Sequence, residues 1–159
     1  AEVFESMKER RAILYVEMKC APSESSALAA EVARLVRAHS LIDSLVVESF
    51  TLKSIAEIKR FAPEIRTAAL FEPRLSCPLP SARKLVEQAL RYSADEIALH
   101  RTLATRRVVE AAQKRGLKTV VWTVDNPAWV KRGRDFGIQA IITNRPAQMR
   151  ARLNELLNA

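Results

Sequence analysis

The sequence predicts an α/β fold in which short strands and longer helices alternate along a chain of 159 residues. Six short segments rich in Val, Ile and Leu are each followed by a segment whose apolar residues recur at helical spacing. No hairpin turn signal stands between the strands, so they are expected to run parallel. Strands that are apolar over nearly their whole length are typical of a parallel sheet covered on both faces.

The expected elements follow one another without a break in the pattern. The strands are expected at 13–19, 44–49, 65–71, 96–100, 118–124 and 138–143, and the helices at 2–10, 24–39, 52–61, 81–92, 102–115, 127–137 and 145–157. Local signals support several boundaries. Pro63 stops the third helix, Ser81 caps the next one, and Gly116 and Gly137 close two others. The segment 72–80 carries three prolines and is expected to be a loop.

Two architectures fit this alternation, an open doubly wound sheet and a TIM (β/α)8 barrel. The three glycines do not follow a strand, so the sequence has no glycine-rich phosphate loop. Polar residues instead gather where the strands end. They are Glu17, Lys19, Glu48, Ser49, Glu72, His100, Trp122, Thr123, Asp125, Thr143 and Asn144. A barrel brings all such ends to one mouth, so the pattern favours a barrel with about six of its eight βα units.

Composition sets limits on the class of protein. The length suits a single domain over 1–159, and no run of about twenty apolar residues predicts a membrane span. The net charge of +8 raises the possibility of a nucleic-acid partner, but Lys and Arg are scattered among Glu residues without interleaved aromatics. Two distant cysteines predict neither a zinc site nor a disulfide framework, which favours a reducing, cytoplasmic location.

The stretch ILYVEMKC, residues 13–20, combines a strand pattern with an acid and a base. Alternation puts Tyr15, Glu17 and Lys19 on one face of the strand and the apolar residues on the other. Two interpretations remain open from these residues alone. Glu17 and Lys19 form either an internal ion pair of a barrel core or part of a functional site at the end of the strand.

Four segments resemble, in order, motifs of the glycerophosphodiester phosphodiesterase family. VEMK resembles its Glu-x-Lys strand, and VVESFTLKSIAEIKRFAPEIRTAALF resembles its Ser-Phe strand with the helix and strand that follow. GLKTVVWTVDNP resembles its Trp-Thr-Val-Asn strand, and FGIQAIITNRP its closing Gly-Val-Asp-x-Ile-x-Thr-Asp-x-Pro segment. Each motif alone is weak, but the four in order span nearly the whole chain, from about Val3 to Met149.

The resemblance implies a TIM barrel of the type found in phospholipase C-like phosphodiesterases. It also implies metal-dependent hydrolysis of glycerophosphodiesters to an alcohol and glycerol 3-phosphate, with Mg²⁺ or Ca²⁺ as cofactor, in lipid and glycerol metabolism. The family's His-Arg-Gly strand, Glu-x-Asp strand and His-Asp segment, which supply the acid–base histidines and most metal ligands, are not in this sequence. We therefore expect the C-terminal portion of such an enzyme, inactive on its own.

The family pattern assigns roles to five residues of this chain. Glu17 would be a metal ligand, and Lys19 would be the catalytic residue that contacts the phosphate. Trp122, Ser49 and Phe50 would bind substrate, with Trp122 as a wall of the pocket.

Other positions depart from the family pattern. Glu48 stands where the family usually has a neutral residue, and the sequence does not fix which face of its strand it occupies. Asp125 stands in place of Asn, and Asn144 in place of Asp, so no role is assigned to either. His100 ends a strand, which gives it a possible path to the mouth of the barrel.

Two hypotheses compete with the enzyme. The chain could be a noncatalytic half-barrel that binds a partner or dimerises, because an incomplete barrel exposes two strand edges. It could also be a basic nucleic-acid-binding domain, which the lack of stacking aromatics disfavours.

Overall fold

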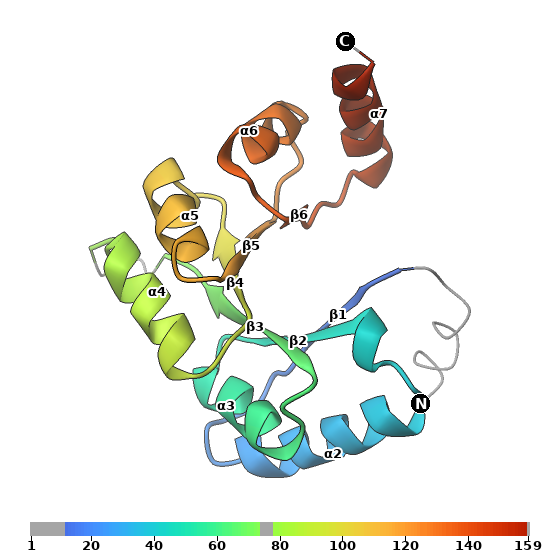
Figure 1. The fold of residues 1–159 in the computed structure, drawn as a ribbon, viewed down its shortest axis with the longest axis vertical. Helices are drawn as coiled ribbons and strands as arrows, with labels where there is room; N and C mark the ends of the chain where they lie inside the picture. Colours follow the sequence, from blue (N-terminus) through green and yellow to red (C-terminus); the bar gives the residue numbers. More distant parts are fainter. Residues whose placement is uncertain (1–11, 74–77, 159) are drawn as a thin grey trace. The chain divides into compact units, whose positions relative to one another are not determined.

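The computed structural model describes residues 12–73 and 78–158, which form two compact units. The first unit comprises residues up to 70 together with 88–96, and the second comprises 71–87 together with the residues from 97 onward. Strands and helices alternate in both, as the ribbon shows (Figure 1). The helix expected at 2–10 lies outside the described residues. The expectation of a single domain remains a prediction.

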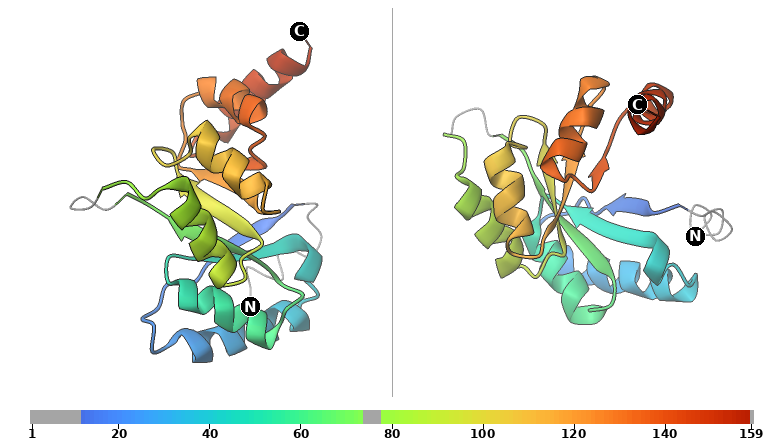
Figure 2. Two further views of the ribbon diagram at one scale, coloured as in Figure 1. Left: turned by 60° about the vertical axis from the view of Figure 1, so that its left-hand side comes forward. Right: turned by 45° about the horizontal axis from the view of Figure 1, so that its top comes forward.

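The first unit contains the N-terminal strands and the helices that follow them. Its elements are β1 (Leu14–Glu17), α2 (Ser25–Ala38), a 3-10 turn (Ile42–Ser44), β2 (Leu45–Ser49), α3 (Leu52–Phe61) and most of β3 (Arg66–Phe71). The three strands are parallel neighbours in chain order, with Glu17 opposite Glu48 in one pair and Glu48 opposite Ala68 in the next. Helices α2 and α3 lie side by side in both views of Figure 2 and pack against each other. The predicted parallel strands are thus confirmed in this unit.

The core of the first unit lies between the two helices and one face of these strands. Leu45 and Val47 from β2 pack with Val36 from α2 and Ile58 from α3, all completely buried. Leu14 and Val16 of β1 pack against the same cluster. Because side chains alternate along a strand, Tyr15 and Glu17 of β1 point to the opposite face, which these helices do not cover.

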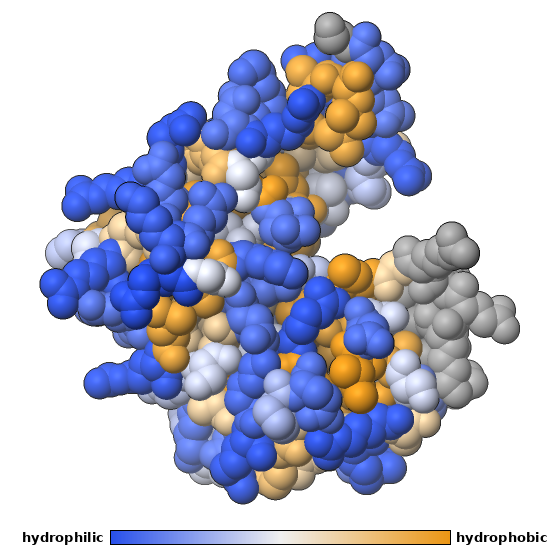
Figure 3. Space-filling view, viewed as in Figure 1, coloured by the Kyte–Doolittle hydropathy of each residue, from blue (hydrophilic) through white to orange (hydrophobic). Residues whose placement is uncertain are grey.

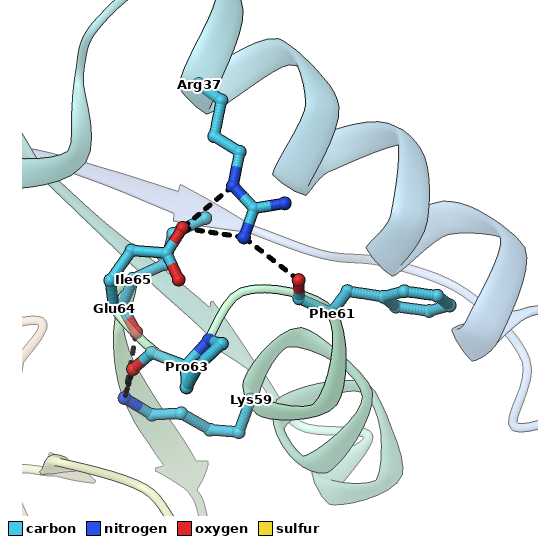
Figure 4. A network of polar contacts seen from close by, with 6 residues as sticks. All are labelled: Arg37, Lys59, Phe61, Pro63, Glu64 and Ile65. Atoms are coloured by element: carbon cyan, nitrogen blue, oxygen red, sulfur yellow. Dashed lines mark hydrogen bonds and ion pairs between the residues drawn. The ribbon is translucent and has the colours of Figure 1, made fainter.

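A polar network fixes the turn between α3 and β3. Figure 4 shows its members, Arg37, Lys59, Phe61, Pro63, Glu64 and Ile65. The Arg37 guanidinium pairs with the Glu64 carboxylate at 2.7 Å and donates to the Phe61 carbonyl at 3.0 Å. The Lys59 ammonium donates to the carbonyls of Pro63 and Ile65 and pairs with Asp95 at 2.7 Å. These contacts satisfy carbonyls at a helix end and after it, where the helix provides no partner.

The second unit continues the alternation. Its elements are most of β4 (Glu96–His100), α5 (Arg106–Gln113), β5 (Lys118–Trp122), α6 (Ala128–Phe136), β6 (Ala140–Ile141) and α7 (Pro146–Leu157), and the two units share α4 (Ala82–Arg91). Strands β4, β5 and β6 are neighbours in chain order. The β5–β6 pair is parallel, with Val120 opposite Ala140. Gly137 ends α6 in the left-handed conformation, with a φ of 75°.

The expected bounds of α5 and β6 are wrong, and β5 ends at Trp122 rather than at residue 124. The helix expected from residue 102 begins at Arg106, because Thr105 rather than Thr102 is its N-cap and accepts a hydrogen bond from the Val108 amide at 3.3 Å. The strand expected at 138–143 is only two residues long. Its flanking residues still make single backbone contacts, such as the Ile142 amide to the Val121 carbonyl at 2.8 Å, without forming a longer ladder.

The charged residues lie mainly on exposed helix faces. Figure 3 shows hydrophilic residues over most of the face that it displays. Many of the basic residues pair with acidic ones one helical turn away, as Arg34 does with Glu31 and Lys131 with Asp135. Such pairs make solvated helix surfaces and require no nucleic-acid partner. Among the helices of residues 12–73 and 78–158, none is long and apolar enough to cross a membrane.

Candidate active site

One face of the first unit carries acidic side chains. Tyr15, Glu17, Glu48 and Glu96 form what we call the carboxylate face. The Tyr15 hydroxyl donates a hydrogen bond to Glu96 Oε2 at 2.8 Å, and Glu96 is only 1% exposed. Burial and the neighbouring Glu96 carboxylate raise the pKa of Tyr15 above its ordinary value, so its hydroxyl keeps its proton and remains a donor. This hydrogen bond satisfies a carboxylate that is otherwise out of reach of water.

Glu48 lies beside Glu17 on this face. The two residues are register partners on β1 and β2, where adjacent parallel strands run about 4.8 Å apart. Glu48 is 8% exposed, and among the described residues no hydrogen-bond donor reaches its Oε2 atom. Burial, followed by the negative charges of Glu17 and Glu96, raises the pKa of Glu48 to about 7. The register that the sequence left open therefore places Glu48 with Glu17.

Lys19 follows the end of β1 and is largely in solvent. Its ammonium lies 3.4 Å from Glu17 Oε2, and its side chain is 79% exposed while that of Glu17 is 29% exposed. The interpretation as an internal ion pair of a core is therefore wrong for Lys19. An exposed pair of this kind contributes little to stability. The ammonium can turn toward an anion without crossing a packed core.

Ser49 and Phe50, which match the family's Ser-Phe, differ in exposure. Ser49 is completely buried, and its hydroxyl donates to the Met18 carbonyl at 2.7 Å while accepting from the Thr51 amide at 3.1 Å. These bonds tie the segment after β1 to the end of β2. Phe50 is 42% exposed and directly follows the strand. The substrate-binding roles of both residues remain predictions.

Trp122 and His100 are neighbours in the second unit. They end β5 and β4, and their ring centroids are 5.2 Å apart at an interplanar angle of 74°, an edge-to-face contact. His100 Nδ1 is 2.8 Å from the Thr102 hydroxyl. Burial and the nearby Arg101 lower the pKa of His100. The contact orients the imidazole against the Trp122 ring at the ends of these strands, and the lowered pKa favours its neutral form. The substrate-binding role of Trp122 remains a prediction.

Asp125 links the segments that follow β5 and β6. Its Oδ1 atom accepts from the Thr143 hydroxyl at 3.0 Å and from the Asn144 amide at 2.8 Å. Its Oδ2 atom accepts from the Asn144 side chain at 3.2 Å. These hydrogen bonds, with that from the Asn144 backbone foremost, lower the pKa of Asp125. The residue that departs from the family pattern therefore has a structural contact in this chain.

The carboxylate face fits part of the metal site that the family pattern implies. Glu17 and Glu48 offer neighbouring carboxylate oxygens, the ligand type that Mg²⁺ and Ca²⁺ prefer. One of these oxygens is buried without a partner, as a ligand atom would be in the absence of its ion. Within the described residues, however, no three His, Cys, Asp or Glu side chains come together to form a site on their own. A complete coordination shell needs further donors.

Sequence reasoning found Glu17 and Lys19 but missed the contact between Tyr15 and Glu96. These two residues are 81 positions apart in the chain, and no local pattern connects them. The strand alternation did place Tyr15 on the face of Glu17, and an acid at the start of a buried strand was the available signal for Glu96.

The structure thus defines a protein with alternating β-strands and α-helices, with acidic and basic side chains at the end of its first described strand. The profile of the glycerophosphoryl diester phosphodiesterase family matches residues 3–148, and the chain belongs to that family. Its fold is that of the (β/α)8 barrels of these proteins, and residues 12–73 and 78–158 supply six of the strands. The family resemblance and the fold class predicted from the sequence are both confirmed.

Known proteins and solved structures are similar to this chain over most of its length. YhdW of Bacillus subtilis is 26% identical over 133 residues, covering 84% of this chain and 53% of its own length. A crystal structure from Silicibacter pomeroyi aligns with a TM-score of 0.80 at 22% identity, over 98% of this chain and 55% of that one. An Oleispira antarctica phosphodiesterase in complex with the product sn-glycerol-3-phosphate aligns at 0.73 and 18% identity, over 92% of this chain and 56% of that one. The chain spans about half the length of the curated relatives that it matches.

Proposed function

We propose that this chain is part of an enzyme that hydrolyses glycerophosphodiesters to an alcohol and glycerol 3-phosphate with the aid of a divalent cation. Family membership supports the reaction class. The observation that carries the assignment of roles is the placement of Glu17 and Lys19 at the end of β1, with a carboxylate and an ammonium 3.4 Å apart and the ammonium exposed.

The charged residues of this chain have different roles in the proposed reaction. The Glu17 carboxylate holds the cation, which when bound polarises a phosphoryl oxygen. The Lys19 ammonium leaves its weak pairing with Glu17 and binds the phosphate, where it offsets negative charge that grows in the transition state. Trp122 in the second unit and Phe50 in the first are proposed as substrate-binding residues, Trp122 through its apolar ring. Ser49, whose buried hydroxyl bonds to the backbone, is proposed to act on substrate only by holding the segment that carries Phe50. None of these residues supplies the acid and base that the leaving alcohol and the attacking oxygen need.

Under this proposal the chain alone does not catalyse the reaction, because the acid and base come from elsewhere. We expect residues 1–159 to show no metal-dependent hydrolysis of glycerophosphocholine, since the loss of an acid–base pair costs many powers of ten in rate. The first experiment is to read the DNA upstream of the codon for Ala1. In-frame sequence that encodes a His-Arg-Gly strand and a Glu-x-Asp strand, expressed together with this chain, should restore hydrolysis. If that longer protein has no phosphodiesterase activity with Mg²⁺ or Ca²⁺, the proposal is wrong.

The alternative of a noncatalytic module has a distinct outcome. A half-barrel that acts by association would form a stable homo-oligomer at micromolar concentration, and substitution of Glu17 or Lys19 would leave that association unchanged. A role in lipid and glycerol metabolism and a cytoplasmic location follow from the proposed reaction and the two cysteines, and both remain predictions.

A further inference from the structure

The carboxylate of Glu48 has no role in the family pattern, yet the fold buries it. Glu48 is 8% exposed on β2, and its Oε2 atom receives no hydrogen bond from residues 12–73 or 78–158. A buried polar atom without a partner is costly and is retained when something outside the protein chain satisfies it. We therefore looked for a ligand that could bind Glu48 Oε2.

Tyr15 and Lys19, which alternate with Glu17 along the same strand segment, direct their donors to other carboxylates. The Tyr15 hydroxyl donates to Glu96, and the Lys19 ammonium lies against Glu17. The neighbours that remain at Glu48 are the carboxylates of Glu17 and Glu96, whose negative charges act on it.

Neighbouring carboxylates are stabilised together by a cation. Glu17 and Glu48 are partners in the parallel register, so their side chains leave the same face at the same level. Mg²⁺ and Ca²⁺ accept several carboxylate oxygens in one coordination shell. A divalent ion between the two would satisfy Oε2 of Glu48 and remove the repulsion between like charges.

We propose that Glu48 is a second carboxylate ligand of the cation held by Glu17, supplied by β2 at a position where the family usually has a neutral residue. The inference rests on the proposed function only in that a cation binds at Glu17. Oxygen atoms of solvent and substrate would complete the coordination shell.

The test measures metal binding, not turnover. Tb³⁺ serves as the probe because its higher charge binds a carboxylate pair more tightly than a divalent ion, and because the nearby Tyr15 ring can sensitise its luminescence. The metal-free 159-residue chain is titrated with Tb³⁺, and Ca²⁺ is then used to displace the probe. The variants are Glu48→Gln, Glu48→Asp and Glu17→Gln. Glu31→Gln, which alters an exposed carboxylate of α2 paired with Arg34, is the matched control.

We expect Glu48→Gln and Glu17→Gln each to weaken Tb³⁺ binding about tenfold or more, with Glu48→Asp intermediate and Glu31→Gln unchanged. Far-ultraviolet circular dichroism confirms that each variant is folded. If Glu48→Gln binds Tb³⁺ as tightly as the unmodified chain while Glu17→Gln does not, the inference fails and the proposed function stands. If neither substitution changes binding, both the role of Glu48 and the metal role of Glu17 are wrong.

Discussion

The hydroxyl of Tyr15 donates a hydrogen bond of 2.8 Å to the carboxylate of Glu96. The bond joins the second residue of β1 to the first residue of β4. The bond makes a nearly inaccessible carboxylate tolerable in the interior of the first unit. It also fixes the Tyr15 side chain on the face that carries Glu17 and Glu48. The stability of this unit and the layout of the candidate metal site therefore depend on one phenol.

Tyr15→Phe removes the only oxygen of this side chain and leaves its ring in place. The Glu96 carboxylate then loses its donor, and we expect the free energy of unfolding to fall by about 1–3 kcal/mol. Urea denaturation followed by circular dichroism measures the change. Tyr92→Phe, in the turn after α4, should alter stability by less than about 0.5 kcal/mol. Equal stability of Tyr15→Phe and the unmodified chain would show that the hydrogen bond is energetically neutral.

The raised pKa of Glu48 predicts a pH dependence of stability in metal-free buffer. Its carboxyl titrates near 4.5 in the unfolded chain and about 7 in the folded one. Below pH 4.5 the carboxyl is protonated in both states, and Glu48 does not lower the free energy of unfolding. Above pH 4.5 the carboxyl ionises in the unfolded chain while the folded chain still holds its proton, which favours unfolding. The free energy of unfolding therefore falls by up to about 3 kcal/mol as the pH rises through 7.

Glu48→Gln should abolish this loss. We expect the variant to be more stable than the unmodified chain at pH 8 and similar to it at pH 4, as measured by denaturant titration in the presence of a chelator. Glu31→Gln provides the comparison, because its exposed carboxylate should leave the pH profile between 5 and 8 unaltered. Parallel profiles for Glu48→Gln and the unmodified chain would contradict the assignment of the group that titrates near 7.

Ser49→Ala tests whether the buried hydroxyl has a structural role. The substitution leaves the Met18 carbonyl without its donor and the Thr51 amide without its acceptor. We expect a loss of about 1–3 kcal/mol in the free energy of unfolding, whether or not substrate is present. Ser23→Ala, at an exposed position before α2, should change nothing. A variant of unaltered stability but higher KM would instead indicate that Ser49 acts through the substrate.

Lys19→Met tests the phosphate role in the form of the protein that carries the acid–base histidines. We expect kcat/KM for glycerophosphocholine to fall by about 100-fold or more, because the ammonium acts on charge that develops in the transition state. Stability should hardly change, since the pair with Glu17 is exposed. Lys53→Met, an exposed lysine of α3, is the control. Retained kcat/KM in Lys19→Met would remove Lys19 from the mechanism.

Sequence periodicity predicted the elements where its signals were unambiguous. The bounds of α3 and β4 agree with the expectation, the first because Pro63 forces the helix to stop and the second because a short apolar run stands between polar residues. The start of α5 was misplaced because the apolar periodicity does not mark where the helix begins, and the residue that caps it is Thr105.

The candidate site was predictable only as far as local alternation reaches. Glu17 and Lys19 follow from the pattern of one strand. The pairing of Glu48 with Glu17 depends on the register between two strands, and a shift of one residue would move Glu48 to the other face. The hydrogen bond between Tyr15 and Glu96 depends on which strands meet in space, which the pattern of a single sequence does not specify.

The hydrogen bonds of Asp125 have a consequence for protein engineering. The Asp125 carboxylate, in the segment after β5, accepts hydrogen bonds from Thr143 and Asn144 in the segment after β6. The two segments are therefore a single exchangeable cassette. A chimaera that transplants one without the other separates Asp125 from its donors, whereas a graft that carries 123–126 together with 143–145 keeps the pair intact.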